Sequence, residues 1–181
     1  NTKMHRRNFI QQSGSLLAGT VLAGNAIAND SFLPVAKKRV AMVGTGVRGL
    51  GMWGKPVLEE FGEVVEFVGL CDINPGRVQT GKKFLGVNCN TYTDFDKMMQ
   101  ETKPDALIVT TVDGTHHQFI IKGLQYGAEI ITEKPLTIDE QKCQSILDAE
   151  EKAGKKIKVT FNYRYSPHRQ KLYELLRSGT I

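Results

Sequence analysis

A glycine-rich turn between a predicted strand and a predicted helix constrains the fold of this chain more than any other feature. It directly follows the β-rich run 39–43 and consists of Gly44, Thr45, Gly46, Val47, Arg48 and Gly49. In a GxGxxG turn the first glycine permits the tight bend, the second lets the backbone approach a pyrophosphate, and the third lets the helix pack on the strand. The pyrophosphate would then meet free backbone N–H groups at the positive end of the helix dipole. The pattern predicts a dinucleotide-binding strand–turn–helix unit.

From Val35 onward, short β-rich runs alternate with amphipathic segments. The predicted strands are 39–43, 64–71, 90–92, 106–110, 129–132 and 158–161, and the predicted helices are 48–61, 75–84, 94–101, 115–126, 138–153 and 167–178. Such alternation is typical of a parallel sheet covered by helices. The chain is therefore predicted to be an α/β protein with a doubly wound parallel sheet, the Rossmann fold.

Polar residues and glycines mark the ends of several predicted helices. Three threonines stand three residues before an acidic or amide residue, which is the spacing of a capping box: Thr93 before Asp96, Thr115 before Gln118, and Thr137 before Glu140. Gly127 and Gly154 stand where two helices should end, because glycine readily adopts the left-handed conformation that closes helices.

An acidic residue follows the second predicted strand. Asp72 lies about two dozen residues past the glycine turn, where Rossmann folds place the carboxylate that accepts hydrogen bonds from the adenosine ribose. Its charge would repel a 2′-phosphate, so NAD is the predicted cofactor. Arg77 is close enough in sequence to keep NADP possible. In the alternative interpretation, Asp72 only opens the turn at 72–75 and caps the next helix.

Polar segments follow the last three predicted strands, at 111–116, 133–135 and 162–164. In a doubly wound sheet the ligand lies across the carboxyl ends of the strands. We therefore expect these segments to face the nicotinamide end of the cofactor.

From about Lys38 to its end, the chain resembles the family of glucose-fructose oxidoreductase, inositol dehydrogenase and MocA. The resemblance rests on the glycine turn, Asp72 and the three polar segments, and the Glu133-Lys134-Pro135 triplet is its most specific part. In place of the proline and asparagine usual in the family's loop, this chain has Val112 and Asp113. The resemblance implies cofactor contacts from the following residues in addition to the turn, Asp72 and Arg77: Thr111, Val112, His116, Glu133, Lys134, Pro135, Asn162 and Arg164.

The resemblance also implies that Lys134 lies beside the nicotinamide and the substrate hydroxyl, as a catalytic residue. A partly desolvated ammonium there could hydrogen-bond a sugar hydroxyl and assist proton movement as hydride leaves the adjacent carbon. Outside this context, a lysine before proline is commonly a solvated surface charge. His116 has a structural alternative at the start of a helix, and Glu133 could either position Lys134 or contact the cofactor.

The family carries a second catalytic element, an Asp and His pair, on a larger β-sheet domain, and no segment of this chain could supply it. We therefore expect a C-terminal α+β substrate domain to be missing from this chain. Residues 38–165 would form the dinucleotide-binding domain and 166–181 the linker helix leading to the absent domain. That domain is also the expected site of homo-oligomer formation.

The amino-terminal segment resembles a twin-arginine export signal. Arg6 and Arg7 precede an apolar run at 16–28, and Ala26-Ile27-Ala28 supplies a small-x-small cleavage pattern. Residues 1–28 would be the signal and 29–37 a linker, which predicts a periplasmic or otherwise exported protein. The alternative is a basic disordered tail.

Composition narrows the possible partners. The chain has a net charge of +5, but no stretch interleaves basic residues with exposed aromatics, so nucleic-acid binding is not expected. The amino-terminal apolar run is too short and glycine-rich for a membrane span. The three cysteines, Cys71, Cys89 and Cys143, lack metal-binding spacing and are predicted to be buried apolar residues, so no metal site is expected.

The leading hypothesis is an NAD(P)-dependent oxidoreductase that transfers a hydride between a sugar or polyol hydroxyl and a tightly held nicotinamide cofactor. Two alternatives remain open from the sequence. One is a redox-neutral glycosidase or epimerase of the same fold that oxidises its sugar only transiently. The other is a dinucleotide-binding module without catalysis.

Overall fold

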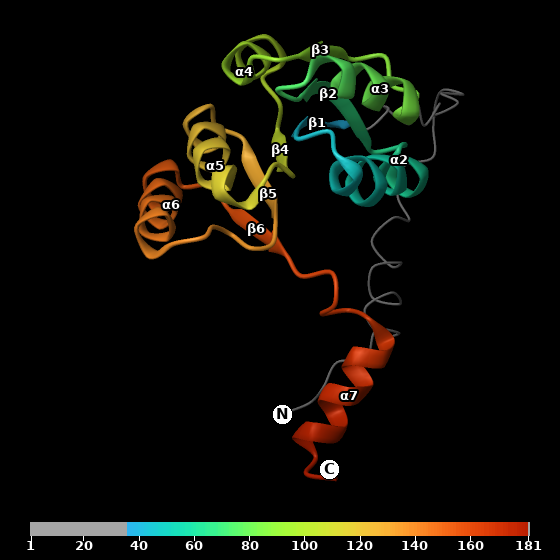
Figure 1. The fold of residues 1–181 in the computed structure, drawn as a ribbon, viewed down its shortest axis with the longest axis vertical. Coiled ribbons are helices and arrows are strands. Elements are labelled where there is room, and N and C mark those ends of the chain that lie inside the picture. The colour runs from blue at the N-terminus through green and yellow to red at the C-terminus, as the bar shows by residue number, and fades with distance from the viewer. Residues whose placement is uncertain (1–35, 181) are drawn as a thin grey trace, which may run out of the picture. The chain divides into compact units, whose positions relative to one another are not determined.

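The computed structural model describes residues 36–180, shown in Figure 1. Within this range six parallel strands form one sheet in the order β3-β2-β1-β4-β5-β6. The strands are β1 Lys38–Val43, β2 Val65–Cys71, β3 Asn90–Tyr92, β4 Ala106–Val109, β5 Glu129–Glu133 and β6 Ile157–Thr160. The predicted doubly wound parallel sheet is confirmed.

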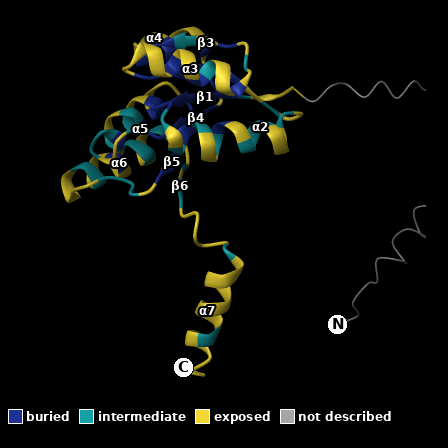
Figure 2. Cartoon of the chain, turned by 45° about the vertical axis from the view of Figure 1, so that its right-hand side comes forward, coloured by how far each residue is buried: buried dark blue, intermediate teal, exposed yellow. Residues whose placement is uncertain are grey.

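Helices connect the strands. They are the π-helical turn η1 Gly49–Gly54, α2 Lys55–Phe61, α3 Pro75–Leu85, α4 Phe95–Thr102, the 3-10 turn η2 Asp113–Thr115, α5 His116–Gln125, α6 Glu140–Ala153 and α7 Pro167–Arg177. The residues of α7 are exposed or half-buried, as Figure 2 shows.

The sheet has an apolar core on each face, because successive side chains of a strand point to opposite sides. Val40 and Met42 of β1 belong to the core covered by η1, α2 and α3. Ala41 and Val43 belong to the core covered by α4, α5 and α6. The buried strands between the two helix layers are dark blue in Figure 2. Burial on both faces explains why the β-rich runs are almost continuously apolar.

The chain reverses its direction across the sheet between β1 and β4. From β1 it proceeds outward to β2 and β3, and it then returns to add β4, β5 and β6 on the other side of β1. Such a switch point leaves a crevice at the carboxyl ends of the two central strands. The glycine turn follows β1 and the segment that begins at Thr110 follows β4, so both border this crevice.

The single helix predicted over 48–61 is wrong in its first half. The segment begins with the π-helical turn η1 and becomes α-helical only at Lys55. Gly49, Gly51 and Gly54 lie within η1, and glycine is a poor former of regular α-helix. Wide turns of this kind occur frequently at functional sites, and η1 places Trp53 beside the carboxyl end of β5.

Two of the predicted helix caps are also wrong. Asp94 rather than Thr93 caps α4, and Asp139 rather than Thr137 caps α6, each through a carboxylate that accepts from the backbone N–H three residues later. Where a threonine and an aspartate are near neighbours, the aspartate is the better acceptor for the free helix N–H groups. Thr115 does precede α5, but its side chain makes no cap bond. Gly154 closes α6 in the left-handed conformation, as predicted.

The cysteines are free thiols. Cys71 and Cys89 are buried as predicted, whereas the prediction is wrong for Cys143, which is half-buried one helical turn before the buried Ile146. Burial, followed by the nearby charges of Asp72 and Asp94, raises the pKa of the Cys71 thiol to about 12, so this side chain stays neutral.

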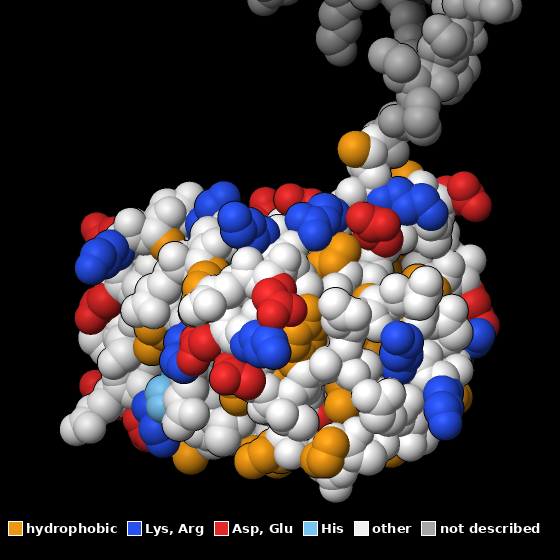
Figure 3. All heavy atoms as spheres, turned by 90° about the horizontal axis from the view of Figure 1, so that it is seen from above, with side chains coloured by type: hydrophobic (Ala, Val, Ile, Leu, Met, Phe, Trp, Pro, Cys, Tyr) orange, Lys and Arg blue, Asp and Glu red, His pale blue; other side chains and the backbone are white. Residues whose placement is uncertain are grey.

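Among residues 36–180, no helix is long and apolar enough to cross a membrane. On the face seen in Figure 3, positive and negative side chains are interspersed. The predicted export signal and the linker that follows it lie almost entirely outside the described residues.

Candidate functional site

The glycine turn has the backbone geometry that its sequence predicts. Gly44 has φ of +93°, and a Cβ there would lie 2.6 Å from the carbonyl carbon and oxygen of Thr110. A Cβ at Gly49 would lie 2.3 Å from the carbonyl oxygen of Gly44. At Gly46, by contrast, a Cβ would meet nothing within 4 Å. Gly44 and Gly49 therefore let the turn pack against the end of β4, while the backbone at Gly46 is open toward a ligand.

Asp72 is buried and fixes the glycine turn. One carboxylate oxygen accepts hydrogen bonds from the backbone N–H of Thr45 at 2.8 Å and from its hydroxyl at 3.1 Å. The other accepts from the backbone N–H of Asn74 at 3.0 Å. Asp72 thus opens the turn after β2, but Asn74 rather than Asp72 caps α3. The guanidinium of Arg77, which is largely exposed, lies 3.8 Å from the carboxylate.

A cavity of about 510 Å³, which we call the glycine-turn pocket, lies at the switch point. Its lining brings together eight of the predicted cofactor residues: Gly44, Gly46, Val47, Arg48, Asp72, Arg77, Thr111 and Val112. Sequence reasoning missed its apolar and hydroxyl-bearing wall, formed by Val43, Cys71, Ile73, Thr93, Phe95, Thr110, Thr115 and Phe119. An open backbone at Gly46 and an apolar wall beside it fit a dinucleotide with a flat aromatic base.

A second cavity, of about 390 Å³, contains Lys134 and is called the lysine pocket here. It is lined by Arg48, Thr110, Thr111, Asp113, His116, Glu133, Lys134, Asn162 and Tyr163. Arg48, Thr110 and Thr111 border both cavities, so the two adjoin. Lys134 is exposed in the described chain and contributes its ammonium to this predominantly polar pocket.

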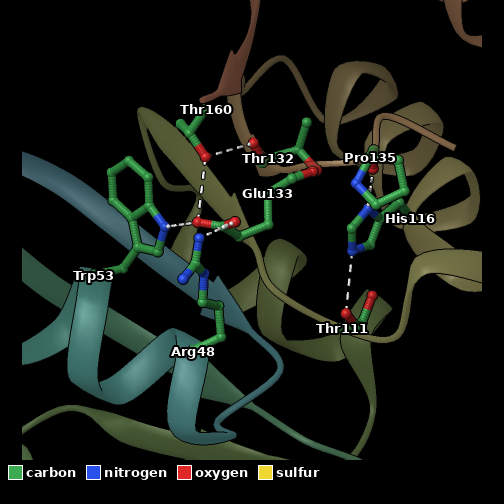
Figure 4. A network of polar contacts seen from close by, with 8 residues as sticks. All are labelled: Arg48, Trp53, Thr111, His116, Thr132, Glu133, Pro135 and Thr160. Atoms are coloured by element: carbon green, nitrogen blue, oxygen red, sulfur yellow. Dashed lines mark hydrogen bonds and ion pairs between the residues drawn. The ribbon is translucent and has the colours of Figure 1, made fainter. Parts of the chain in front are cut away.

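The carboxylate of Glu133 is at the centre of a hydrogen-bond network (Figure 4). It accepts from Arg48 Nη2 and Trp53 Nε1, both at 2.9 Å, and from the Thr160 hydroxyl at 3.2 Å. Burial alone would raise the pKa of Glu133, but the bonds from Arg48 and Trp53 hold this pKa below its ordinary value. The carboxylate therefore stabilises the fold above its ordinary pKa, and this contribution is lost as the pH falls through the folded-state pKa.

His116 is fully buried on the other side of the triplet. Its Nδ1 lies 2.8 Å from the carbonyl oxygen of Pro135, and its Nε2 lies 3.1 Å from that of Thr111 (Figure 4). Carbonyl oxygens only accept, so a neutral imidazole donates to one of them at a time. These contacts support the structural interpretation of His116, which joins the 111–116 loop to the triplet. The bond between Lys134 and Pro135 is cis.

The remaining predicted residues lie around these two cavities. Thr45 is buried beneath the turn and Gly49 is buried at the start of η1. Arg164 lies beyond the lysine pocket, in a hollow of about 610 Å³ that also contains Trp53 and Asn162. Sequence reasoning missed Trp53 and Thr160, which donate to Glu133 and line the same hollow. The motif spacing contains no signal for these two contacts.

The site combines an open backbone at Gly46, a pocket with an apolar wall and an adjoining pocket that contains Lys134. The described residues contain no cluster of three or more His, Cys, Asp or Glu side chains that could hold a metal ion. The Lys134 ammonium is a hydrogen-bond donor in the lysine pocket.

Comparison with known proteins agrees with this geometry. Residues 38–161 match the profile of the family described as an oxidoreductase family with an NAD-binding Rossmann fold, abbreviated GFO_IDH_MocA. The protein YteT of Bacillus subtilis is 38% identical over 148 residues, which are 80% of this chain and 35% of YteT. An inositol 2-dehydrogenase/D-chiro-inositol 3-dehydrogenase of Lactiplantibacillus plantarum is 26% identical, over 75% of this chain and 40% of that enzyme.

A solved structure with a similar fold is the WlbA dehydrogenase of Chromobacterium violaceum in complex with NADH and UDP-GlcNAcA. It superimposes with a TM-score of 0.71 at 25% identity and covers 78% of this chain and 40% of that protein. The chain therefore spans well under half the length of these relatives.

Proposed function

Because the chain belongs to the GFO_IDH_MocA oxidoreductase family with an NAD-binding Rossmann fold, we propose that the complete protein oxidises a hydroxyl group of a sugar or polyol. The observation that carries the proposal is the position of Lys134 in a polar pocket adjoining the glycine-turn pocket. Inositol dehydrogenases among the relatives support a polyol as substrate class.

The residues of this chain divide the work between binding and proton movement. The turn at Gly46 and the N–H groups after it would hold the pyrophosphate, and Asp72 would receive the adenosine ribose at the edge of the same pocket. Bound NAD would supply the hydride acceptor. The side chain of Lys134 would hydrogen-bond the substrate hydroxyl. In its neutral amine form it would accept the hydroxyl proton as the carbon bearing that hydroxyl loses hydride to NAD.

The proposal is tested with the complete protein, incubated with NAD and a panel of inositols, hexoses and their acids, while the absorbance of the reduced nicotinamide is followed. A lasting rise with one of these substrates supports a net oxidoreductase. A transient rise followed by return to the baseline indicates the redox-neutral glycosidase or epimerase. Tight NAD binding without any absorbance change over the whole panel would contradict catalysis and favour a binding module.

We expect the protein to bind NAD more tightly than NADP, because a 2′-phosphate would lie beside the Asp72 carboxylate. Asp72→Ala should weaken NAD binding by about 1–3 kcal/mol, the cost of a lost charged hydrogen bond. It should also narrow the difference in affinity between NAD and NADP. Calorimetry with both cofactors measures this difference. Tighter NADP binding by the unmodified protein would instead assign the dominant role to the exposed Arg77.

We further propose that Arg6 and Arg7 direct export of the folded protein. Replacing both with lysine should retain the protein in the cytoplasm, because twin-arginine export depends on the arginine pair. Fractionation of cells that express the complete protein, with immunoblotting of each fraction, measures this. An unchanged distribution would show that the segment is not such a signal.

A further inference from the structure

The residues on both sides of Lys134 are held by buried polar contacts from other parts of the chain. Before it, the Glu133 carboxylate accepts from Arg48, Trp53 and Thr160. After it, the Pro135 carbonyl oxygen lies 2.8 Å from a ring nitrogen of buried His116. Figure 4 shows the two sets of contacts converging on the triplet from opposite sides. The Lys134 backbone thus lies between two fixed points.

We propose that Glu133 is a positioning residue that holds Lys134 and the glycine turn at fixed positions relative to each other. It does so by fixing the Arg48 guanidinium and η1 to the carboxyl end of β5. The inference rests on the proposed function for the role of Lys134, but only on the NAD-binding fold for the role of Arg48.

The first support is that donors within the protein occupy both carboxylate oxygens of Glu133. Its side chain is 6% exposed, and both of its oxygens are occupied by donors of the protein: Arg48 binds one, while Trp53 and Thr160 share the other. A buried carboxylate is tolerated only when such partners replace water. The carboxylate of Glu133 is therefore held mainly by contacts within the protein, which favours the positioning role over a direct cofactor contact.

The second support is the identity of the segments that these donors belong to. Arg48 is the fifth residue of the glycine turn, Trp53 lies in η1, and Thr160 ends β6. Arg48 also borders both the glycine-turn pocket and the lysine pocket. A movement of Glu133 would thus change the geometry of the glycine-turn pocket and the position of Lys134 together.

The test compares two Glu-to-Gln variants on one strand of the complete protein. Glu133→Gln keeps the shape of the side chain and removes its charge at the carboxyl end of β5. Glu129→Gln is the matched control, because Glu129 begins the same strand and pairs with Lys38 at 2.7 Å, far from both pockets. For each variant, NADH affinity, the pH profile and kcat of cofactor reduction, and thermal unfolding are measured.

Tryptophan emission supplies a readout that does not depend on activity. Trp53 is the one tryptophan of the 181-residue sequence. Subtracting the spectrum of a Trp53→Phe variant isolates its emission in the complete protein. Glu133→Gln should shift this emission, because the indole N–H loses its charged acceptor.

We expect Glu133→Gln to weaken NADH binding about tenfold. The kcat should fall by up to about 10²-fold, with a smaller change in KM, since misplacement of a catalytic group mainly affects the chemical step. Glu129→Gln should leave NADH affinity and kcat within about twofold of the unmodified protein, because an exposed ion pair contributes little. A fall in Tm alone for Glu133→Gln, with affinity, emission and kcat unchanged, would overturn the proposal and leave a purely structural role.

If Glu133→Gln does not fold, Trp53→Phe decides the question. Trp53 borders neither the glycine-turn pocket nor the lysine pocket, and its N–H donates to Glu133. NADH affinity should then fall by roughly tenfold, the lower end of the loss of one hydrogen bond to a charged group. Unchanged affinity would overturn the proposal. If the unmodified protein binds NADH but oxidises no polyol, the proposed function fails while affinity and emission still decide the role of Glu133.

Discussion

Replacing Lys134 with methionine in the complete protein should lower the rate of cofactor reduction by roughly 10²–10⁴-fold, the contribution of a lost acid–base group. Methionine keeps much of the bulk of the side chain but removes its ammonium from the lysine pocket. Cofactor affinity should change far less, because the glycine turn and Asp72 border a separate cavity that Lys134 does not line. Single-turnover measurements of NAD reduction at saturating substrate would measure the chemical step directly.

The control for this experiment is Lys97→Met. Lys97 is exposed on α4 and pairs with Glu101 on the same helix, away from both pockets. The Lys97→Met substitution therefore removes one surface charge without changing a residue of either pocket. A Lys134→Met protein that reduces its cofactor at the rate of the control would remove Lys134 from the mechanism. The triplet would then be a structural feature of the fold.

The sheet could be predicted because its information is local. The central strands β1, β2 and β4 each contain a short apolar run, because a central strand is buried on both faces of the sheet. The glycine turn adds a backbone requirement that few residues meet, with Gly44 at φ of +93°. Together these features predicted the sheet and a cavity beside the glycine turn.

The contacts around Glu133 could not be predicted because they join residues far apart in the sequence. Arg48 and Glu133 are 85 positions apart, and nothing in either segment indicates its partner. Trp53 resembles an ordinary core residue in the sequence, and only the π-helical turn brings its N–H to the carboxylate. Glu133 remained ambiguous between positioning and cofactor contact for the same reason.

The helix starts were mispredicted because neighbouring polar residues compete for one role. Thr93 and Asp94 both precede α4, and only the backbone conformation decides which side chain reaches the free N–H groups. Asp72 illustrates a related limit. Its place after β2 was correctly identified from the sequence, but its bonds to Thr45 and Asn74 depend on how two turns meet.

Alanine at Gly49 should destabilise the fold, whereas alanine at Gly46 should chiefly weaken cofactor binding. A Cβ at Gly49 would lie 2.3 Å from the Gly44 carbonyl oxygen and 2.7 Å from the Thr110 hydroxyl, so the turn or β4 must move. Overpacking of this kind costs about 3 kcal/mol, or a fall in Tm of about 6–12 °C for a domain of this size. Thermal unfolding of the complete protein without cofactor measures it.

The same methyl group at Gly46 meets no protein atom within 4 Å, so the Tm should stay close to that of the unmodified protein. It would, however, stand where the backbone borders the glycine-turn pocket. One additional carbon in a close-fitting pocket should weaken NADH binding roughly 10–200-fold. Calorimetry on both variants separates the cofactor-binding role of Gly46 from the structural role of Gly49, because Gly46→Ala should lower NADH affinity without lowering the Tm. Full NADH affinity in a folded Gly46→Ala protein would mean that the pyrophosphate does not approach this turn, and the placement of the cofactor would have to be revised.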